Sequence, residues 1–136
     1  METRSTHYLV ELWDANAEKL NSVPEARELL VEAARQARVT VLHSAFHRFN
    51  PVGVSGVVVI AESHITIHTW PEECYAAADI FTCGDHAMPE VAAQYLAKAF
   101  ESQHVDVTRV VRGIKRPATR PQPVSLDKLQ HANILQ

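Results

Sequence analysis

The sequence lacks the features that mark several common classes of protein. It has two cysteines in 136 residues, too few for a disulfide-stabilised secreted domain, so we expect Cys74 and Cys83 to be free thiols. It has no run of about 20 apolar residues, so we predict no transmembrane helix. The first residues lack the apolar segment of a signal peptide. We therefore expect a cytoplasmic protein that does not bind membranes.

Basic residues are missing from the middle of the chain. No lysine or arginine lies between Arg48 and Lys98, whereas the same stretch contains the acidic residues Glu62, Glu72, Glu73, Asp79, Asp85 and Glu90. Such a region favours a cationic ligand and repels phosphate, although a solvated acidic surface would have the same composition. The net charge of −3 also argues against nucleic acid as a partner.

Glycine is scarce too, and three of the four glycines lie within residues 53–84. Residues 57–70 of this segment are rich in Val, Ile and Thr and predict β-structure. This run is far longer than the usual strand of about 5–6 residues, so we expect it to break at its polar interruption, Glu62-Ser63-His64. No Gly, Pro or Asn is present there to relax a reversal, which predicts local backbone strain.

The rest of the chain predicts two helices and further strands. A capping box at Ser22–Glu25 begins one helix, which ends near Arg38, and Asp85 is expected to cap a second helix with Pro89 in its first turn. We expect a polar connection at Asp14–Asn21 and strands at Thr6–Trp13, Val39–Phe49, on either side of Ser63, at Tyr75–Thr82 and at Val105–Arg112.

This order predicts an α+β fold, a two-layer sandwich of a mostly antiparallel sheet with helices on one face. We place residues 1–116 in a single domain. Residues 117–136 are expected to form a proline-rich tail, with a short helix at Ser125–Leu135.

Eight histidines raise the question of a metal site. His43 and His47, and likewise His64 and His68, have a spacing that would place both imidazoles on one face of a helix. On a strand, at about 3.3 Å per residue, such histidines lie roughly 13 Å apart and cannot share an ion. Because both pairs lie in predicted strands, we predict no metal site.

Ser63, His68 and Cys83 are the candidate reactive residues of the central segment. A Ser-His-Cys hydrolase is conceivable, but no Gly-x-Ser-x-Gly motif surrounds Ser63. Histidine on a half-buried strand is usually a packed residue, and cysteine in a cytoplasmic protein is usually a small apolar core residue. Spacing alone therefore leaves the roles of these three residues open.

Four motifs of the central segment resemble those of a known family: Phe46-His-Arg-Phe49, Gly53–Ile60, Glu62–Glu72 and Asp79-Ile-Phe-Thr-Cys-Gly84. They closely resemble the small prokaryotic-type S-adenosylmethionine decarboxylases, and the resemblance runs from about His7 to Gly113. Two features depart from it. Cys74 stands where a small residue without a thiol is expected, and the chain after Gly113 is longer than the family core requires.

The resemblance implies a self-cleaving proenzyme. The Ser63 hydroxyl would attack the carbonyl carbon of Glu62, and His68 would act as the base. The products would be residues 1–62 and residues 63–136, the latter headed by a covalent pyruvoyl cofactor derived from Ser63. Cys83 would then serve as the acid that protonates the substrate carbon, since a cysteine thiol is mostly protonated at pH 7.

The implied substrate is S-adenosylmethionine, bound to the pyruvoyl group as a Schiff base and decarboxylated for spermidine biosynthesis. Phe49 and Trp70 would contact the adenine or sulfonium, and Glu72 the ribose hydroxyls, although both aromatic residues could equally be core residues. The resemblance also implies no metal requirement and a homo-oligomer of cleaved protomers with sites at a subunit interface.

Two alternatives remain open from the sequence. The same mechanism could act on ornithine or arginine, because the acidic region suits any of these cations. The chain could also be a homologue that no longer processes itself and serves as a regulatory subunit. The presence of Ser63, His68 and Cys83 argues against this second alternative.

Overall fold

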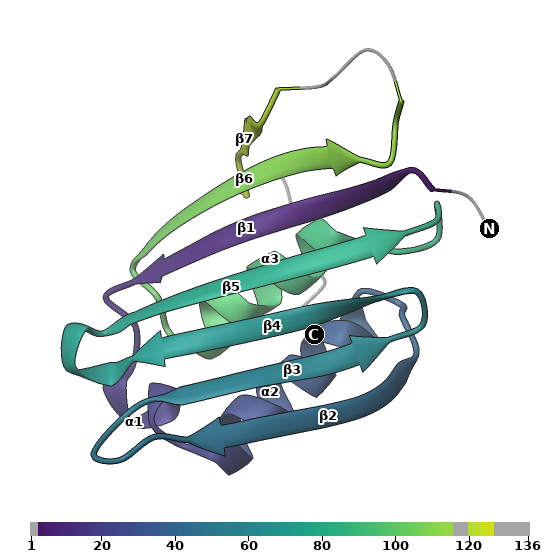
Figure 1. Cartoon of the computed structure of the whole chain (residues 1–136). Helices are drawn as coiled ribbons and strands as arrows, with labels where there is room; N and C mark the ends of the chain where they lie inside the picture. The colour runs from purple at the N-terminus through teal and green to yellow at the C-terminus, as the bar shows by residue number, and fades with distance from the viewer. Residues whose placement is uncertain (1–2, 116–119, 127–136) are drawn as a thin grey trace.

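A computed structural model describes residues 3–115 and 120–126 of the chain. Within these residues, one seven-stranded sheet is covered on one face by helices (Figure 1). The elements in chain order are β1 (Ser5–Trp13), α1 (Ala17–Leu20), α2 (Val23–Gln36), β2 (Val41–Arg48), β3 (Val54–Ile60), β4 (Ser63–Trp70), the 3₁₀ turn η1 (Pro71–Glu73), β5 (Tyr75–Cys83), α3 (Pro89–Ala99), β6 (His104–Arg112) and β7 (Gln122–Val124).

The strands follow the order β2-β3-β4-β5-β1-β6-β7, and every pairing between them is antiparallel. The predicted α+β sandwich is therefore confirmed. The long apolar run does break as expected: it forms the two strands of the β3–β4 hairpin, with Ala61 and Glu62 between them.

The core lies between the sheet and the helices. Alternate residues of the strands, such as Val10, Ile65 and Ile80, are fully buried beneath α2 and α3. Burying each such side chain stabilises the fold by about 1.5–3 kcal/mol relative to exposure. As predicted, Ser22 caps α2, its hydroxyl oxygen accepting a hydrogen bond from the Glu25 amide at 3.2 Å.

Gly56 of β3 shows why glycine occurs in the middle of a strand. A Cβ atom added at this position would lie 2.0 Å from the ring of Phe46 on β2. The Phe46 ring instead covers the glycine and packs against the core, with the Arg27 guanidinium of α2 above it at 5.1 Å. The glycine is therefore required by close packing between neighbouring strands.

Two local predictions differ from the structure. Residues 14–21 are not simply a connection, because Asn16 accepts a hydrogen bond from the Lys19 amide and caps the short helix α1. Asp85 does not cap α3: the N-cap is Met88, which makes no side-chain capping bond. The Met88 amide donates instead to the carbonyl of Ala37, the residue that follows α2. A tertiary contact between the two helices thus takes the place of a local cap.

The proline-rich segment contributes an element that the sequence did not predict. Gln122–Val124 form β7, which pairs with Val107, Thr108 and Arg109 of β6. The helix predicted at 125–135 lies outside the described residues apart from Ser125 and Leu126, which are not helical.

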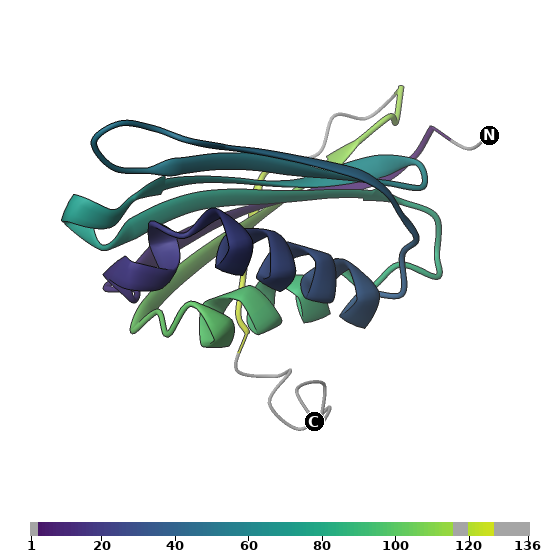
Figure 2. The same cartoon turned by 90° about the horizontal axis from the view of Figure 1, so that it is seen from below.

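The second face of the sheet, which we call the open face, carries no helix in the part of the chain that the structure describes (Figure 2). Several apolar side chains of this face are more than a third exposed: Leu9, Trp13, Val59 and Trp70. Each helix within residues 3–115 and 120–126 is too short or too polar to span a lipid bilayer.

Candidate active site

The β3–β4 hairpin places Glu62 and Ser63 at a strained turn. Ile60 pairs with Ser63, so Ala61 and Glu62 form a two-residue connection. Glu62 has φ of +75°, in the left-handed region that favours glycine. A residue with a side chain in that region costs of order 1–3 kcal/mol. The predicted backbone strain is therefore present, and it lies on the residue that precedes Ser63.

Ser63 and Cys83 meet at this turn. The Ser63 hydroxyl donates a hydrogen bond to the carbonyl oxygen of Glu62, the group immediately before it. The Cys83 sulfur lies 3.5 Å from the Ser63 hydroxyl oxygen and 3.5 Å from the same Glu62 carbonyl oxygen. Cys83 reaches this position because it ends β5, the strand beside β4. A hydroxyl, a thiol and a strained peptide carbonyl therefore share one small site.

His68 does not lie in this cluster. It is five residues beyond Ser63 on the same strand, which corresponds to roughly 16 Å at about 3.3 Å per residue. Its Nδ1 atom is hydrogen-bonded to the Ser55 hydroxyl of β3 at 2.8 Å. Both side chains line a shallow cavity of about 320 Å³. A single copy of the chain thus separates His68 from Ser63.

The predicted substrate contacts lie at the same remote end of the sheet. Trp70 is the last residue of β4, whose first residue is Ser63, and Glu72 follows in η1. Phe49 lies just after β2, where its amide donates to the Gly53 carbonyl at 2.7 Å. The exposed fractions of Phe49 and Trp70 are 46% and 44%, so neither is a core residue.

A network centred on Asp79 of β5 occupies the open face near the turn. His7 of β1, and His64 and Thr66 of β4, are hydrogen-bonded to the Asp79 carboxylate, His64 at 3.1 Å. Burial alone would raise the pKa of Asp79, but the hydrogen bonds from Thr66, His7 and His64 hold the pKa below its usual value. The network fixes His64, the residue directly after Ser63.

Sequence reasoning missed this network because its members come from three strands. The ligand atoms of His7, His64 and Asp79 lie within 4.8 Å of one another, a spacing that suits a metal ion. The Arg112 guanidinium, however, lies 3.3 Å from the other nitrogen of His7. Since arginine can only donate, this contact leaves the proton of a neutral His7 on the nitrogen that faces Asp79. The arrangement is that of a hydrogen-bonded charge network.

The acidic stretch noted in the sequence does not form one surface. Glu62 and Asp85 lie near the β3–β4 turn, whereas Glu72 and Glu73 lie in η1 at the opposite end of β4. Glu90 belongs to the helix layer, where the buried Tyr8 hydroxyl donates to it. Each end of the open face therefore carries its own acidic groups.

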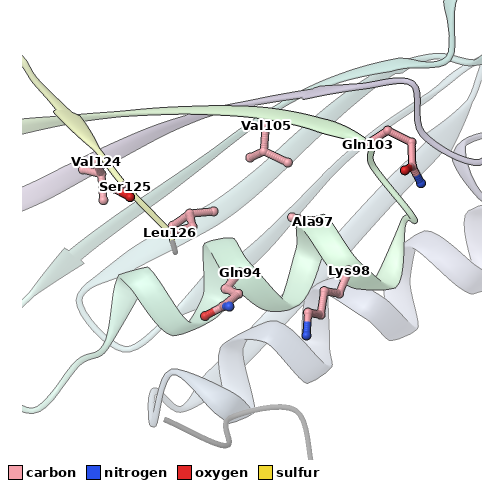
Figure 3. A pocket seen from close by; sticks show the side chains of 8 residues that line it. All are labelled: Gln94, Ala97, Lys98, Gln103, Val105, Val124, Ser125 and Leu126. Carbon is pink, nitrogen blue, oxygen red and sulfur yellow. The ribbon is translucent and has the colours of Figure 1, made fainter. Parts of the chain in front are cut away.

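A second cavity, of about 340 Å³, lies on the helix side of the sheet between α3 and the β6–β7 edge (Figure 3). Lys98 and Gln94 of α3 line it together with Val105 and Leu126. It contains none of the candidate reactive residues, which belong to the hairpin and to the open face.

Comparisons with known proteins agree with this geometry. Residues 6–113 match the S-adenosylmethionine decarboxylase family. The chain is 47% identical over 132 residues to the S-adenosylmethionine decarboxylase proenzyme of Thermodesulfovibrio yellowstonii, covering 96% of this chain and 98% of that protein. It is 44% identical over 115 residues to the proenzyme of Pyrococcus horikoshii, covering 85% and 83%.

The fold is also similar to a solved structure. The crystal structure of the adenosylmethionine decarboxylase from Aquifex aeolicus superposes with a TM-score of 0.78 at 36% sequence identity. The match covers 88% of this chain and 99% of that one. The fold therefore belongs to an architecture already seen in a protein of that name.

Proposed function

The chain belongs to the S-adenosylmethionine decarboxylase family, and from this premise we propose that it cleaves itself between Glu62 and Ser63 and decarboxylates S-adenosylmethionine at a site shared by two copies. The observation that carries the proposal is the contact of the Ser63 hydroxyl and the Cys83 sulfur with the strained Glu62 carbonyl.

Self-cleavage begins with the attack of the Ser63 hydroxyl oxygen on the carbonyl carbon of Glu62. The peptide C–N bond breaks, the new ester C–O bond forms, and the Ser63 amine takes up a proton. This exchange is uphill for a relaxed peptide, and the left-handed conformation of Glu62 reduces its cost. A base then removes the Cα proton of Ser63. The Glu62 carboxylate leaves, which separates residues 1–62 from residues 63–136.

The dehydroalanine left at position 63 hydrolyses to a pyruvoyl group with release of ammonia. When present, this group supplies the electron sink for decarboxylation that pyridoxal phosphate supplies in other enzymes. Ser63 as the precursor fits the position, since its hydroxyl oxygen lies 3.5 Å from the Cys83 sulfur. Cys83 can return a proton to the substrate carbon after CO₂ has left, and its thiolate can then take up a proton from solvent.

The base for cleavage must come from elsewhere, and a second copy supplies it. Ser63 and Cys83 lie at one end of the open face, and His68 and Trp70 lie toward the other. A two-fold axis that reverses the strand direction brings the first end of one copy against the second end of its partner. His68 of each copy then faces Ser63 of the other. Within one copy the two residues are roughly 16 Å apart, too far for His68 to act as the base.

The open face has the composition of such an interface. Leu9, Trp13 and Val59 expose apolar surface that a second sheet would cover. Pairing the two ends also unites the acidic groups that one chain keeps apart, Glu62 from one copy and Glu72 from the other. The combined negative charge suits a sulfonium, whose positive charge is fixed. Phe49 and Trp70 offer exposed rings for the adenine or the sulfonium.

The test is release of CO₂ from carboxyl-labelled S-adenosylmethionine, with ornithine and arginine as competing candidates. We expect turnover of S-adenosylmethionine alone, and none by Ser63→Ala. Efficient decarboxylation of ornithine or arginine would move the proposal to the alternative substrate. No decarboxylation of any of the three by cleaved protein would reject it.

A further inference from the structure

Three aromatic rings form a ladder across the open face at the end remote from Ser63. Trp70 pairs with Tyr75 in the β4–β5 register, and Trp13 follows Leu12, which pairs with Ala76 on the other side of β5. The ring centroids are 4.1 Å apart for Trp13 and Tyr75 and 5.3 Å apart for Trp70 and Tyr75. Both pairs are stacked, with interplanar angles of 25° and 28°. Tyr75 therefore lies between the two tryptophans.

A carboxylate fixes the central ring of this ladder. The Tyr75 hydroxyl donates to Glu11 of β1, with oxygen–oxygen distances of 2.8 and 2.9 Å to the two carboxylate atoms. Burial, and then the neighbouring Glu11 carboxylate, raises the pKa of Tyr75 to about 12, so that the hydroxyl remains a donor at any physiological pH. The ring can neither rotate nor slide without losing this bond.

We propose that Tyr75, stacked between Trp13 and Trp70 and anchored by Glu11, is a positioning residue that holds the Trp70 indole in the orientation that receives the adenosyl group of the substrate. This inference rests on the proposed function, because it assumes that Trp70 contacts the substrate. Trp70 is the last residue of β4 and is 44% exposed. In the described residues, its stacking on Tyr75 is the one aromatic contact of that ring.

The physical effect is preorganisation of binding. A half-exposed tryptophan side chain samples several rotamers. A ligand that binds only one rotamer has a lower affinity, because only the fraction of the protein in that rotamer can bind it. Stacking on a fixed ring removes those alternatives before the substrate arrives. The ladder should therefore change the affinity for the adenosyl group and leave self-cleavage untouched, because its rings stack on one another and Tyr75 bonds to Glu11, whereas the groups proposed for cleavage, Ser63, Cys83 and His68, have other partners.

The experiment compares Tyr75→Leu, which removes the stack, with Tyr75→Phe, which keeps the ring and loses the bond to Glu11. For Tyr75→Leu we expect the KM for S-adenosylmethionine to rise about tenfold, with kcat within about twofold. Tyr75→Phe and Glu11→Leu should each raise KM about two- to threefold, and the double variant no further, because both remove the same hydrogen bond.

A direct binding readout is available because both tryptophans of the chain, Trp13 and Trp70, belong to the ladder. 5′-Methylthioadenosine carries the adenosine without a reactive amino group, so its quenching of tryptophan emission reports binding alone. We expect its dissociation constant to rise with the KM across the three variants. Tyr95→Leu in α3 is the matched control, a tyrosine removed from the helix layer, and should keep the wild-type KM.

The outcomes separate the two proposals. A wild-type protein that does not decarboxylate S-adenosylmethionine would contradict the proposed function itself. If the wild type is active, an unchanged KM and an unchanged methylthioadenosine affinity in Tyr75→Leu would overturn the positioning role. Loss of self-cleavage or of kcat in Tyr75→Phe would also overturn it, because the ladder would then act on structure or chemistry instead of on binding.

Discussion

The Cys83 sulfur lies 3.5 Å from the Ser63 hydroxyl oxygen, although Ser63 begins β4 and Cys83 ends β5. The contact exists because the β3–β4 turn folds back beside the end of β5. In the antiparallel register of β4 and β5, His64 pairs with Phe81. The same register, continued two positions toward the turn, sets Glu62 opposite Cys83. The proposed cleavage site and the proposed proton donor are thus aligned by strand pairing.

Cys83→Ala should separate processing from turnover. We expect at least partial self-cleavage but a loss of about 10²–10⁴-fold in kcat, as for removal of a general acid. Protonation should also fall on the pyruvoyl carbon, so that alanine accumulates at position 63 during turnover. Cys74, which lies between η1 and the opposite end of β5, serves as the control, and Cys74→Ala should show neither effect. Normal turnover by Cys83→Ala, with no alanine in the mass spectrum, would remove Cys83 from the mechanism.

Relaxing the turn should slow self-cleavage. Glu62→Gly accepts a φ of +75° without strain, whereas Glu62→Ala keeps the strain and removes the carboxylate. Releasing about 1–1.5 kcal/mol of strain from the precursor raises the activation free energy of cleavage by that amount, which lowers the rate about tenfold. We therefore expect Glu62→Gly precursor to cleave about tenfold more slowly than Glu62→Ala on a denaturing gel followed over time. Equal rates would show that the conformation of Glu62 does not drive the reaction.

The sequence predicted much of this site because its signals are local. The apolar run broken at Glu62-Ser63-His64 specified the hairpin, and the absence of glycine there specified the strain. The Asp79 network and the Trp13–Tyr75–Trp70 ladder depend on strand order, which puts β1 between β5 and β6. No local pattern reports such long-range neighbours. The distance between His68 and Ser63, by contrast, follows from strand spacing alone once both residues lie on one strand.

Asp79 should stabilise the fold in a pH-dependent way. Its folded pKa is below its unfolded value, so its contribution is fully present above about pH 4 and is lost as the pH falls through the folded pKa. At pH 6, Asp79→Asn should therefore lower the free energy of unfolding by about 1–3 kcal/mol, because His7, His64 and Thr66 lose the carboxylate that accepts their hydrogen bonds. The difference from wild type should shrink below pH 4. A constant difference from pH 6 to pH 2, measured by urea unfolding, would contradict this.

A site shared between copies predicts complementation. Ser63→Ala and His68→Ala should each be inactive alone. Co-expressed, they form mixed dimers in which the His68→Ala copy supplies Ser63 and Cys83 and its partner supplies His68. With random pairing, half of the dimers are mixed, and each mixed dimer carries one complete site of two. Activity should therefore return to about a quarter of the wild-type value. Co-expression of Ser63→Ala with Cys83→Ala should restore none, because both residues are needed from the same copy.

The intact mass of the purified protein tests the central claim most directly. We predict two chains, residues 1–62 with an ordinary carboxylate at Glu62, and residues 63–136 with a pyruvoyl group that blocks Edman degradation. Ser63→Ala should give one chain of 136 residues. Wild-type protein that remains a single intact chain after prolonged incubation, with an unmodified serine at position 63, would contradict the account.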